Sequence, residues 1–393
     1  KEKQLGNIPN EIGFIPIELD DKKEKFKINN EDYQLTKFRT SLLVISKSHQ
    51  GIGNSYLDFF DNKLFVATAN GIFSYVEIEK FDTGINKLNV ISSNIKDMIN
   101  YELFYQSSKY GIKDLLIYKN KFYISYLNEI KKGCFNTSIL VADLNLKKLN
   151  FKNFFTPQVC INTENDVDIS YQNLYGVFNP HLAGGRMFPY LENQILFSIG
   201  GMRYFAHAQN TNNVIGKIIS INVNTKKHKI ISMGHRNVQG LFYDRESNVI
   251  FSTEHGPEGG DEVNVNTQHE NKVQNYGWPV SSYGEHPIEG DMSSSALYEI
   301  APLHKSHKDH GFIEPIKYYV PSIGITEIIK LNSQFTGKDT NEILHGSMGW
   351  DIEEGDKSLH HIVLNENYLI KGIIFEFYKY EKSKSHVVQK FLN

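Results

Sequence analysis

Residues 241–256 read LFYDRESNVIFSTEHG, which is an apolar strand, a polar turn and a second strand that ends in small residues. The same pattern recurs as YLDFFDNKLFVATANG, LLIYKNKFYISYL, MFPYLENQILFSIGG and, more weakly, NEILHGSMG, in residues 56–71, 115–127, 187–201 and 341–349. Units built only of strands that repeat at such intervals are typical of β-propeller blades. Five units and a contribution from the N-terminal residues predict an all-β chain folded as a six-bladed β-propeller.

The chain divides into an arm and one large domain. Residues 1–50 carry loop-like and charged runs and predict an irregular N-terminal arm with one or two strands. Residues 51–393 predict a single propeller domain. Within it, residues 282–315 are rich in His, Pro, Gly and Ser, and they predict a long loop insertion over one face.

Composition excludes two classes of partner. The 393 residues carry a formal net charge of -3, with lysines scattered among acids, so nothing indicates a nucleic-acid surface. No apolar run is long enough to predict a membrane span. The two cysteines, Cys134 and Cys160, lie near predicted strand ends. A disulfide and a pair of reduced core thiols are both compatible with this pattern.

Polar groups gather around the strand predicted at 249–253. Arg236 precedes it, and Glu254-His255-Gly256-Pro257 follows. A strand that ends in Gly-Pro exposes backbone carbonyls, because proline donates no N–H to the ladder. Carbonyls, carboxylates and a guanidinium so close together suit a hard cation and an anionic ligand. The alternative is structural: Arg236 would be a buried fork paired with Asp261 or Glu262, and the glycines would serve turns.

Equivalent loops of the repeats carry similar residues. Gly201-Met202-Arg203, the 254–257 segment and Gly346-Ser347 each follow a second strand. Loops at one end of a propeller converge on its central channel, so these residues predict a shared site on one face.

Two further patterns stay open. His304, His307 and His310 are spaced by three, but the lysines and aspartate among them favour solvated histidines over a metal site. Tyr276 and Trp278 could form a stacking platform for a sugar or a structural corner.

Several motifs occur together in one order. They are HLAGGRMFPYLENQILFSIGGMR (181–203), AQNTNNVIGKIISINV (208–223), GHRNVQGL (234–241), EHGPEGGDEVN (254–264), NYGWPVSSYG (275–284), PSIGITEI (321–328) and NEILHGSM (341–348). This set resembles the soluble quinoprotein glucose/sorbosone dehydrogenases, also called aldose sugar dehydrogenases. The likeness is clear over about residues 174–364 and only in outline before that.

The resemblance implies an oxidoreductase that uses pyrroloquinoline quinone (PQQ) and calcium. His181 would be the catalytic base that takes the proton of a sugar C1 hydroxyl while hydride moves to the quinone. Arg236 and Asn237 would contact the quinone oxygens, with Arg236 stabilising charge that develops there. Arg203 and His255 are further candidates for binding the cofactor.

The same resemblance implies a metal site in the loop after residue 255. The carbonyls of Gly256 and Pro257 would bind calcium. Asp261 and Glu262 are counted with this site, where they would organise the loop or hold Arg236.

Partners and location follow from the family. We expect a small sugar or alcohol substrate and an external electron acceptor. Because Lys1 is not preceded by Met, we expect a mature or trimmed form. The expected location is the periplasm or the outside of the cell, with anchoring through a removed N-terminus as one option.

Two other functions remain as alternatives. A propeller that lost its cofactor would be a binding module. Met348-Gly349 stands where the family carries a lysine, and the chain ends at Asn393, about where an arginine-rich strand begins; both favour this reading. A calcium-dependent hydrolase, such as a lactonase, is the other. No specific motif supports it.

Overall fold

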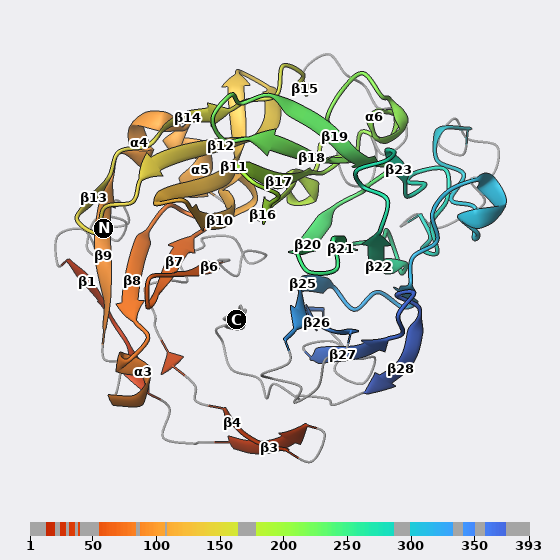
Figure 1. Cartoon of the computed structure of the whole chain (residues 1–393). Coiled ribbons are helices and arrows are strands. Elements are labelled where there is room, and N and C mark those ends of the chain that lie inside the picture. Colours follow the sequence, from red (N-terminus) through yellow and green to blue (C-terminus); the bar gives the residue numbers. More distant parts are fainter. Residues whose placement is uncertain are drawn as a thin grey trace. The chain divides into compact units, whose positions relative to one another are not determined.

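The computed structural model describes residues 13–19, 24–28, 31–35, 38–39, 55–83, 87–106, 108–163, 178–286, 299–332, 341–349 and 358–374. Its chain divides into two compact units. The first unit lies within Lys1–Asn128 and Ile139–Phe154, and the second within Glu129–Ser138 and Phe155–Glu381. Figure 1 shows the order of the elements along the chain.

Two larger, mainly antiparallel sheets contain most of the described strands up to residue 162. The first has the order β1 (Phe14–Pro16), β9 (Lys87–Ser93), β8 (Phe73–Glu77), β7 (Lys63–Thr68), β6 (Ser55–Phe60), with β13 (Lys148–Leu149) parallel to β9. The second has the order β10 (Ile112–Tyr118), β11 (Lys121–Lys131), β12 (Cys134–Asp143), β14 (Lys152–Phe155), with β15 (Ile161–Asn162) on β12. Phe65, Phe73 and Phe122 pack in the core, where Phe122 meets the other two rings edge-on.

Three further sheets lie in the second unit. They are β16 (Gly184–Tyr190), β17 (Gln194–Ile199), β18 (Lys217–Asn222), β19 (His228–Met233), β23 (Gln274–Asn275); then β20 (Val238–Asp244), β21 (Val249–Glu254), β22 (Asp261–Asn266), β24 (Lys317–Tyr319); then β25 (Ile325–Leu331), β26 (Asn341–Ser347), β27 (Leu359–Leu364), β28 (Ile370–Ile374). Strand β20 packs between β16 and β25. Arg186 on β16 forms an ion pair with Glu327 on β25, whose Oε1 accepts the Leu241 N–H of β20 at 3.4 Å. The first strands of these three sheets therefore form one packed series (Figure 1).

The helices of the described residues are all short. They are α3 (Lys80–Thr83), α4 (Ile95–Met98), α5 (Tyr101–Gln106), α6 (Ala206–Gln209) and the 3-10 turns η1 (Ser108–Tyr110), η2 (Pro180–Leu182) and η3 (Lys308–His310). Within the described ranges, no helix has the length and apolar character that crossing a membrane requires.

The prediction of six blades is wrong, because the described residues form five blade-like sheets. Each sheet contains one of the five repeats found in the sequence. The sixth blade was assigned to the N-terminal residues, but β1 instead pairs with β9 at the edge of the first sheet, with Phe14 opposite Asn89. The other described N-terminal strands form two small pairs, β2 (Glu18–Leu19) with β5 (Phe38–Arg39) and β3 (Glu24–Ile28) with β4 (Glu31–Leu35). Residues 1–12, 20–23, 29–30, 36–37 and 40–50 of the predicted arm lie outside the described residues.

The two cysteines are joined. Cys134 on β12 and Cys160 form a disulfide across 26 residues of sequence, with Cα atoms 5.5 Å apart. The bridge lies within the second unit. It joins the first residue of β12 to the residue directly before β15, the strand that pairs with β12. The alternative of two reduced thiols is thereby excluded.

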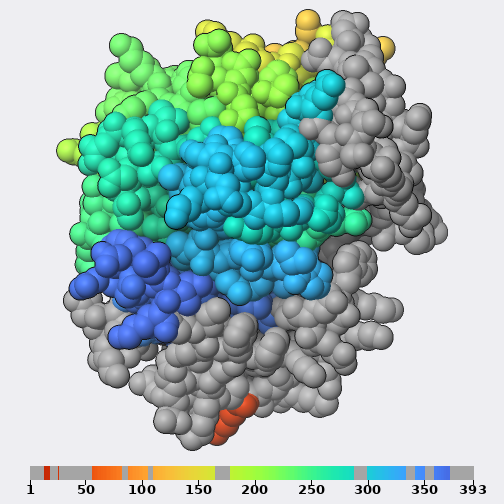
Figure 2. Space-filling view, turned by 90° about the vertical axis from the view of Figure 1, so that its right-hand side faces the viewer, coloured from red at the N-terminus to blue at the C-terminus, as the bar shows by residue number. Residues whose placement is uncertain are grey.

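The segment predicted as a loop insertion reaches the surface. Its residues 287–298 lie outside the described residues, and the rest holds η3 and continues into β24. In Figure 2 the residues around 300–330, coloured cyan to light blue, border the teal residues of the preceding segment.

A buried pair of histidines on the last sheet packs against Tyr319 of the preceding sheet. His345 on β26 and His360 on β27 are directly opposite, and their rings stack at 4.8 Å and 4°. The Tyr319 hydroxyl lies 2.8 Å from His345 Nε2. Burial, helped by the neighbouring His360, lowers the pKa of His345 to about 3. The His345 ring is therefore neutral in the folded protein across the ordinary pH range.

We predict that His345 makes the fold sensitive to acid. The unfolded chain protonates this imidazole near its ordinary pKa of about 6.5, whereas the folded chain does so only near 3. Between these values the unfolded state binds more protons, so stability falls as the pH falls, by about 1.4 kcal/mol per pH unit. His345→Gln keeps an acceptor for Tyr319 and does not titrate. Urea unfolding at pH 6, 5 and 4 should show this slope in the wild type and its loss in the variant. The matched change His310→Gln, at an exposed histidine, should keep the slope, and equal slopes in all three proteins would contradict the prediction.

Candidate functional site

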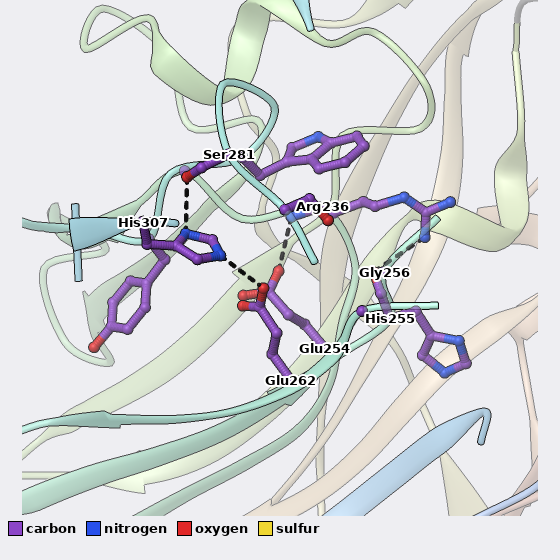
Figure 3. Close-up of a pocket in the computed structure, with 12 residues that line it drawn as sticks. Arg236, Glu254, His255, Gly256, Glu262, Ser281 and His307 are labelled. Carbon is purple, nitrogen blue, oxygen red and sulfur yellow. Dashed lines mark hydrogen bonds and ion pairs between the residues drawn. The ribbon is translucent and has the colours of Figure 1, made fainter. Parts of the chain in front are cut away.

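A small pocket that includes several charged and polar residues in its lining opens among the loops of the second unit (Figure 3). Its 12 lining residues come from 234–236, 254–262, 276–282 and the single residue His307. Three of these segments coincide with the motifs GHRNVQGL, EHGPEGGDEVN and NYGWPVSSYG. The fourth contribution comes from the loop that precedes β24.

Strand pairing places two carboxylates at the pocket floor. Glu254 ends β21, Glu262 lies on β22, and the antiparallel register sets them directly opposite each other. The loop between them turns tightly. A Cβ on Gly256 would clash with the backbone of the following glycines, and Gly260 has φ +72° and no room for a side chain beside Gly284. The glycines therefore allow the two strand ends to meet.

Asp261 fixes the loop between β21 and β22 through hydrogen bonds of its carboxylate. Its carboxylate is fully buried and accepts hydrogen bonds from the Gly256 N–H at 3.0 Å, the Ser322 hydroxyl at 2.8 Å and the Ile325 N–H at 3.0 Å. The loop is thereby attached to the start of β25. This geometry agrees with a loop-organising role for Asp261, while its assignment to the metal site stays a prediction.

Glu254 organises the segment that carries Arg236. One oxygen accepts the Arg236 backbone N–H at 2.8 Å, and the other lies 3.0 Å from His235 Nδ1 and 3.1 Å from Asn264 Nδ2. The buried His235 ring in turn stacks on Tyr276 at 4.9 Å. A buried carboxylate with so many donors is compensated within the protein.

Glu262 belongs to a second buried series of hydrogen bonds, which also includes His307 and Ser281. His307 Nε2 lies 3.1 Å from Glu262 Oε1, and its Nδ1 lies 2.9 Å from the Ser281 hydroxyl (Figure 3). Burial alone would lower the pKa of His307, but the hydrogen bond and charge of Glu262 outweigh it, so that pKa is raised. Burial also raises the pKa of Glu262. The pair therefore retains a proton.

The Arg236 side chain extends over the pocket, as Figure 3 shows. Its Nη1 donates to the His255 carbonyl at 3.0 Å, and its guanidinium lies 5.4 Å from the centre of the Trp278 ring. The Asp261 and Glu262 carboxylates bond instead to the partners given above. Their contacts therefore do not match the alternative in which one of them pairs with the Arg236 guanidinium. Arg236 thus places a cationic group in the pocket lining, beside a flat indole.

Backbone hydrogen bonds connect three further predicted site residues, Arg203, His181 and Asn237, to the segment around Arg236. In the turn before Arg203, the Gly201 N–H donates to the Arg236 carbonyl at 2.9 Å and the Met202 N–H donates to the Leu182 carbonyl at 3.0 Å. His181 is exposed on η2, next to this turn. The Asn237 side chain is buried, and its oxygen accepts the Gly184 N–H at 3.1 Å.

The structure divides the predicted residues into two groups. Arg236, His255, Gly256 and Glu262 line the pocket. The others, which are His181, Arg203, Asn237, Pro257 and Asp261, are not among its lining residues. For all of them the chemical role stays a prediction.

Sequence reasoning missed several members of the site, among them Glu254 and His307. Glu254 was noted only as the end of a strand, although its place opposite Glu262 could have been derived from a hairpin register. His307 was interpreted as solvated, which is wrong, since it is 1% exposed. His304 and His310 are exposed and stack on each other at 3.9 Å. Nothing in the every-third spacing distinguishes His307 from these two.

The described residues fit a flat anionic cofactor and a cation in part. Arg236 and Trp278 offer a cationic group over an aromatic plane. No described residue donates a hydrogen bond to the carbonyl oxygens of Gly256 or Pro257, so these oxygens can accept a hard cation. Among the same residues, no group of three or more His, Cys, Asp or Glu side chains could hold a metal. A calcium ion here would therefore depend on backbone oxygens.

Solved structures share this fold. A glucose dehydrogenase aligns with a TM-score of 0.60 and 20% identity, over 82% of this chain and 86% of that one. The apo-form of the soluble aldose sugar dehydrogenase from Escherichia coli aligns with a TM-score of 0.58 and 18% identity, over 81% and 85% of the two chains.

Sequence relatives match over shorter spans. An uncharacterised protein of Synechocystis is 31% identical over 173 residues, which is 41% of this chain and 37% of that protein. An aldose sugar dehydrogenase of Escherichia coli is 45% identical over 56 residues, 14% of each chain. The matches thus span well under half of either curated relative. The family model for glucose/sorbosone dehydrogenases matches residues 58–373, which is most of the sequence. The chain therefore belongs to the glucose/sorbosone dehydrogenase family.

Proposed function

We propose that this protein is a sugar dehydrogenase that oxidises the C1 hydroxyl of an aldose and uses PQQ and calcium. Family membership supports the sugar dehydrogenase class. The observation that carries the finer proposal is the placement of Arg236. Its guanidinium is fixed by the His255 carbonyl and Trp278, in the pocket that the Gly256 carbonyl segment also lines.

Each of the predicted site residues would have a separate role in this reaction. PQQ, when bound, supplies the hydride acceptor. Arg236 would bind its anionic oxygens, and the carbonyls of Gly256 and Pro257 would hold calcium. His181 would accept the proton of the C1 hydroxyl.

His255 would act as a neutral group. Burial lowers the pKa of His255, and the charge of Arg236 lowers it further, while Asp261 opposes them. A neutral imidazole beside Arg236 adds no second positive charge and can accept a hydrogen bond.

The Cys134–Cys160 disulfide supports a location in the periplasm or outside the cell, because such bridges persist in oxidising compartments. An external electron acceptor completes the proposed turnover.

The test is a PQQ titration of calcium-loaded protein, followed by absorbance, with dye reduction measured after an aldose is added. Saturable binding and sugar-dependent dye reduction are expected. Calcium binding without quinone binding would overturn the proposal and leave a binding module or a hydrolase. Because the absorbance change reports binding without turnover, loss of cofactor binding and loss of catalysis can be told apart.

A further inference from the structure

The start of strand β12 contacts the segment of His181 at two points, one before that histidine in the sequence and one after it. Before it, the Phe178 ring stacks on Phe135 of β12, with centroids 4.7 Å apart and 24° between the planes. After it, the Ala183 carbonyl accepts the Thr137 hydroxyl at 2.8 Å. The exposed histidine therefore lies between two anchors on one strand.

The turn η2 between these anchors is itself closely tied. The Asn179 side chain accepts the His181 N–H at 3.0 Å, and the Asn179 N–H donates to the Met202 carbonyl at 3.1 Å. Next to the Leu182 carbonyl there is no room for a side chain on Gly200, where a Cβ would lie 2.1 Å from that oxygen. A single turn packed in this way moves as one piece, so a shift of either anchor also shifts the His181 side chain.

The opposite face of β12 is attached to another segment. Successive side chains of a strand point to opposite faces, so Cys134 and Asn136 alternate with the two residues that contact the His181 segment. Cys134 forms the disulfide with Cys160, and Asn136 Nδ2 donates to the Pro157 carbonyl at 3.0 Å. The strand start is thus held on one face while it supports η2 with the other.

The Thr137 contact is deeply buried. Both Thr137 and Ala183 are 0% exposed, and the Ala183 carbonyl also accepts the Gly200 N–H at 2.9 Å. Water does not readily replace a buried hydroxyl that is removed, so its partner loses one bond outright. Valine in place of Thr137 has the same shape without the donor. That substitution therefore releases one anchor of η2 and leaves the packing in place.

We propose that the start of β12 positions the His181 imidazole for proton transfer. Phe135 and Thr137 are positioning residues, since they contact the backbone segment of His181, and the Cys134–Cys160 bridge holds the strand that carries them. The proposal rests on the proposed function, in which His181 accepts the proton of the C1 hydroxyl. It links turnover to the redox state of the disulfide.

The first measurement is amide exchange by mass spectrometry on the full chain without quinone, so that it reports the turn independently of activity. In Thr137→Val the amides of His181 and Leu182 should exchange about tenfold faster, and Thr137→Ser, which keeps the hydroxyl, should restore the wild-type rate. Replacing both Cys134 and Cys160 by alanine should also accelerate this exchange.

The second measurement is dye reduction with PQQ and an aldose. Thr137→Val should lower kcat about tenfold with PQQ affinity unchanged, because a displaced base affects only the chemical step. Placed in His181→Ala, the same valine should lower kcat no further, since its effect acts through the imidazole. Thr68→Val is the matched control: Thr68 is 1% exposed, and its hydroxyl donates to Asn70 Oδ1 at 2.5 Å in the first unit. This control should lower stability and leave kcat unchanged.

Four outcomes would overturn the proposal. They are wild-type exchange at His181 in Thr137→Val, a tenfold loss of kcat that persists in His181→Ala, no rescue by serine, and wild-type exchange at His181 when both cysteines are alanine. The serine variant also separates misfolding from loss of the hydroxyl. If exchange changes as expected but the wild type reduces no dye with PQQ, the proposed dehydrogenase activity fails while the support of η2 by β12 stands.

Discussion

Replacing His181 by alanine is expected to lower kcat/KM for an aldose about 1,000-fold, within the range of general base catalysis. The side chain is exposed on η2, which the Asn179 side chain caps by accepting the His181 backbone N–H at 3.0 Å. This cap uses the backbone of residue 181, so alanine preserves it. The loss should therefore appear in kcat, with PQQ affinity unchanged.

The measurement is steady-state dye reduction across pH, together with a PQQ titration of each protein. His310→Ala removes another exposed histidine and should leave both values as they are. A decrease below tenfold, or a parallel loss of PQQ binding, would assign His181 a structural role instead.

Replacing Arg236 by lysine is expected to lower kcat/KM at least 100-fold and to weaken PQQ binding, even though the charge is kept. The guanidinium reaches the His255 carbonyl and lies over Trp278 at the same time. An ammonium is a point charge on a flexible chain and cannot reproduce a planar fork that stacks on a ring. Removing one group that stabilises developing charge typically costs 10²–10³-fold in rate.

Arg245→Lys is the matched control, because Arg245 is exposed in the turn between β20 and β21. Comparison of PQQ affinity and turnover in the two variants separates binding from catalysis. Wild-type values for Arg236→Lys would show that only charge matters at this position, contrary to the geometry described above.

Much of the fold could be predicted from repeated strand patterns. Each of the five repeats found in the sequence provides strands to one sheet, and the run at 249–253 is β21. The count of blades failed at the N-terminus. The residues of β1 have the composition of a strand, but composition does not tell whether a strand starts a new sheet or joins an existing edge. Pairing with β9 is decided by tertiary contacts.

The site was predictable where it is continuous in sequence. Arg236, His255, Gly256 and Glu262 line one pocket because a hairpin and its flanking turns bring near neighbours together. His307 lies 45 residues from Glu262, and only packing of the loop before β24 brings the two into contact. Single-sequence patterns contain no signal for such a distant pairing.

The hydrogen bonds of Asp261 join two equilibria that would otherwise be independent. One carboxylate holds the Gly256 N–H of the proposed calcium loop and the Ile325 N–H at the start of β25. Opening the loop therefore also releases the first residue of the neighbouring sheet. A ligand that binds only the closed loop stabilises that sheet by mass action, and loosening of the sheet lowers the ligand's apparent affinity to the same extent. Occupancy of the loop should thus be readable at a distance, as slower amide exchange at Ile325.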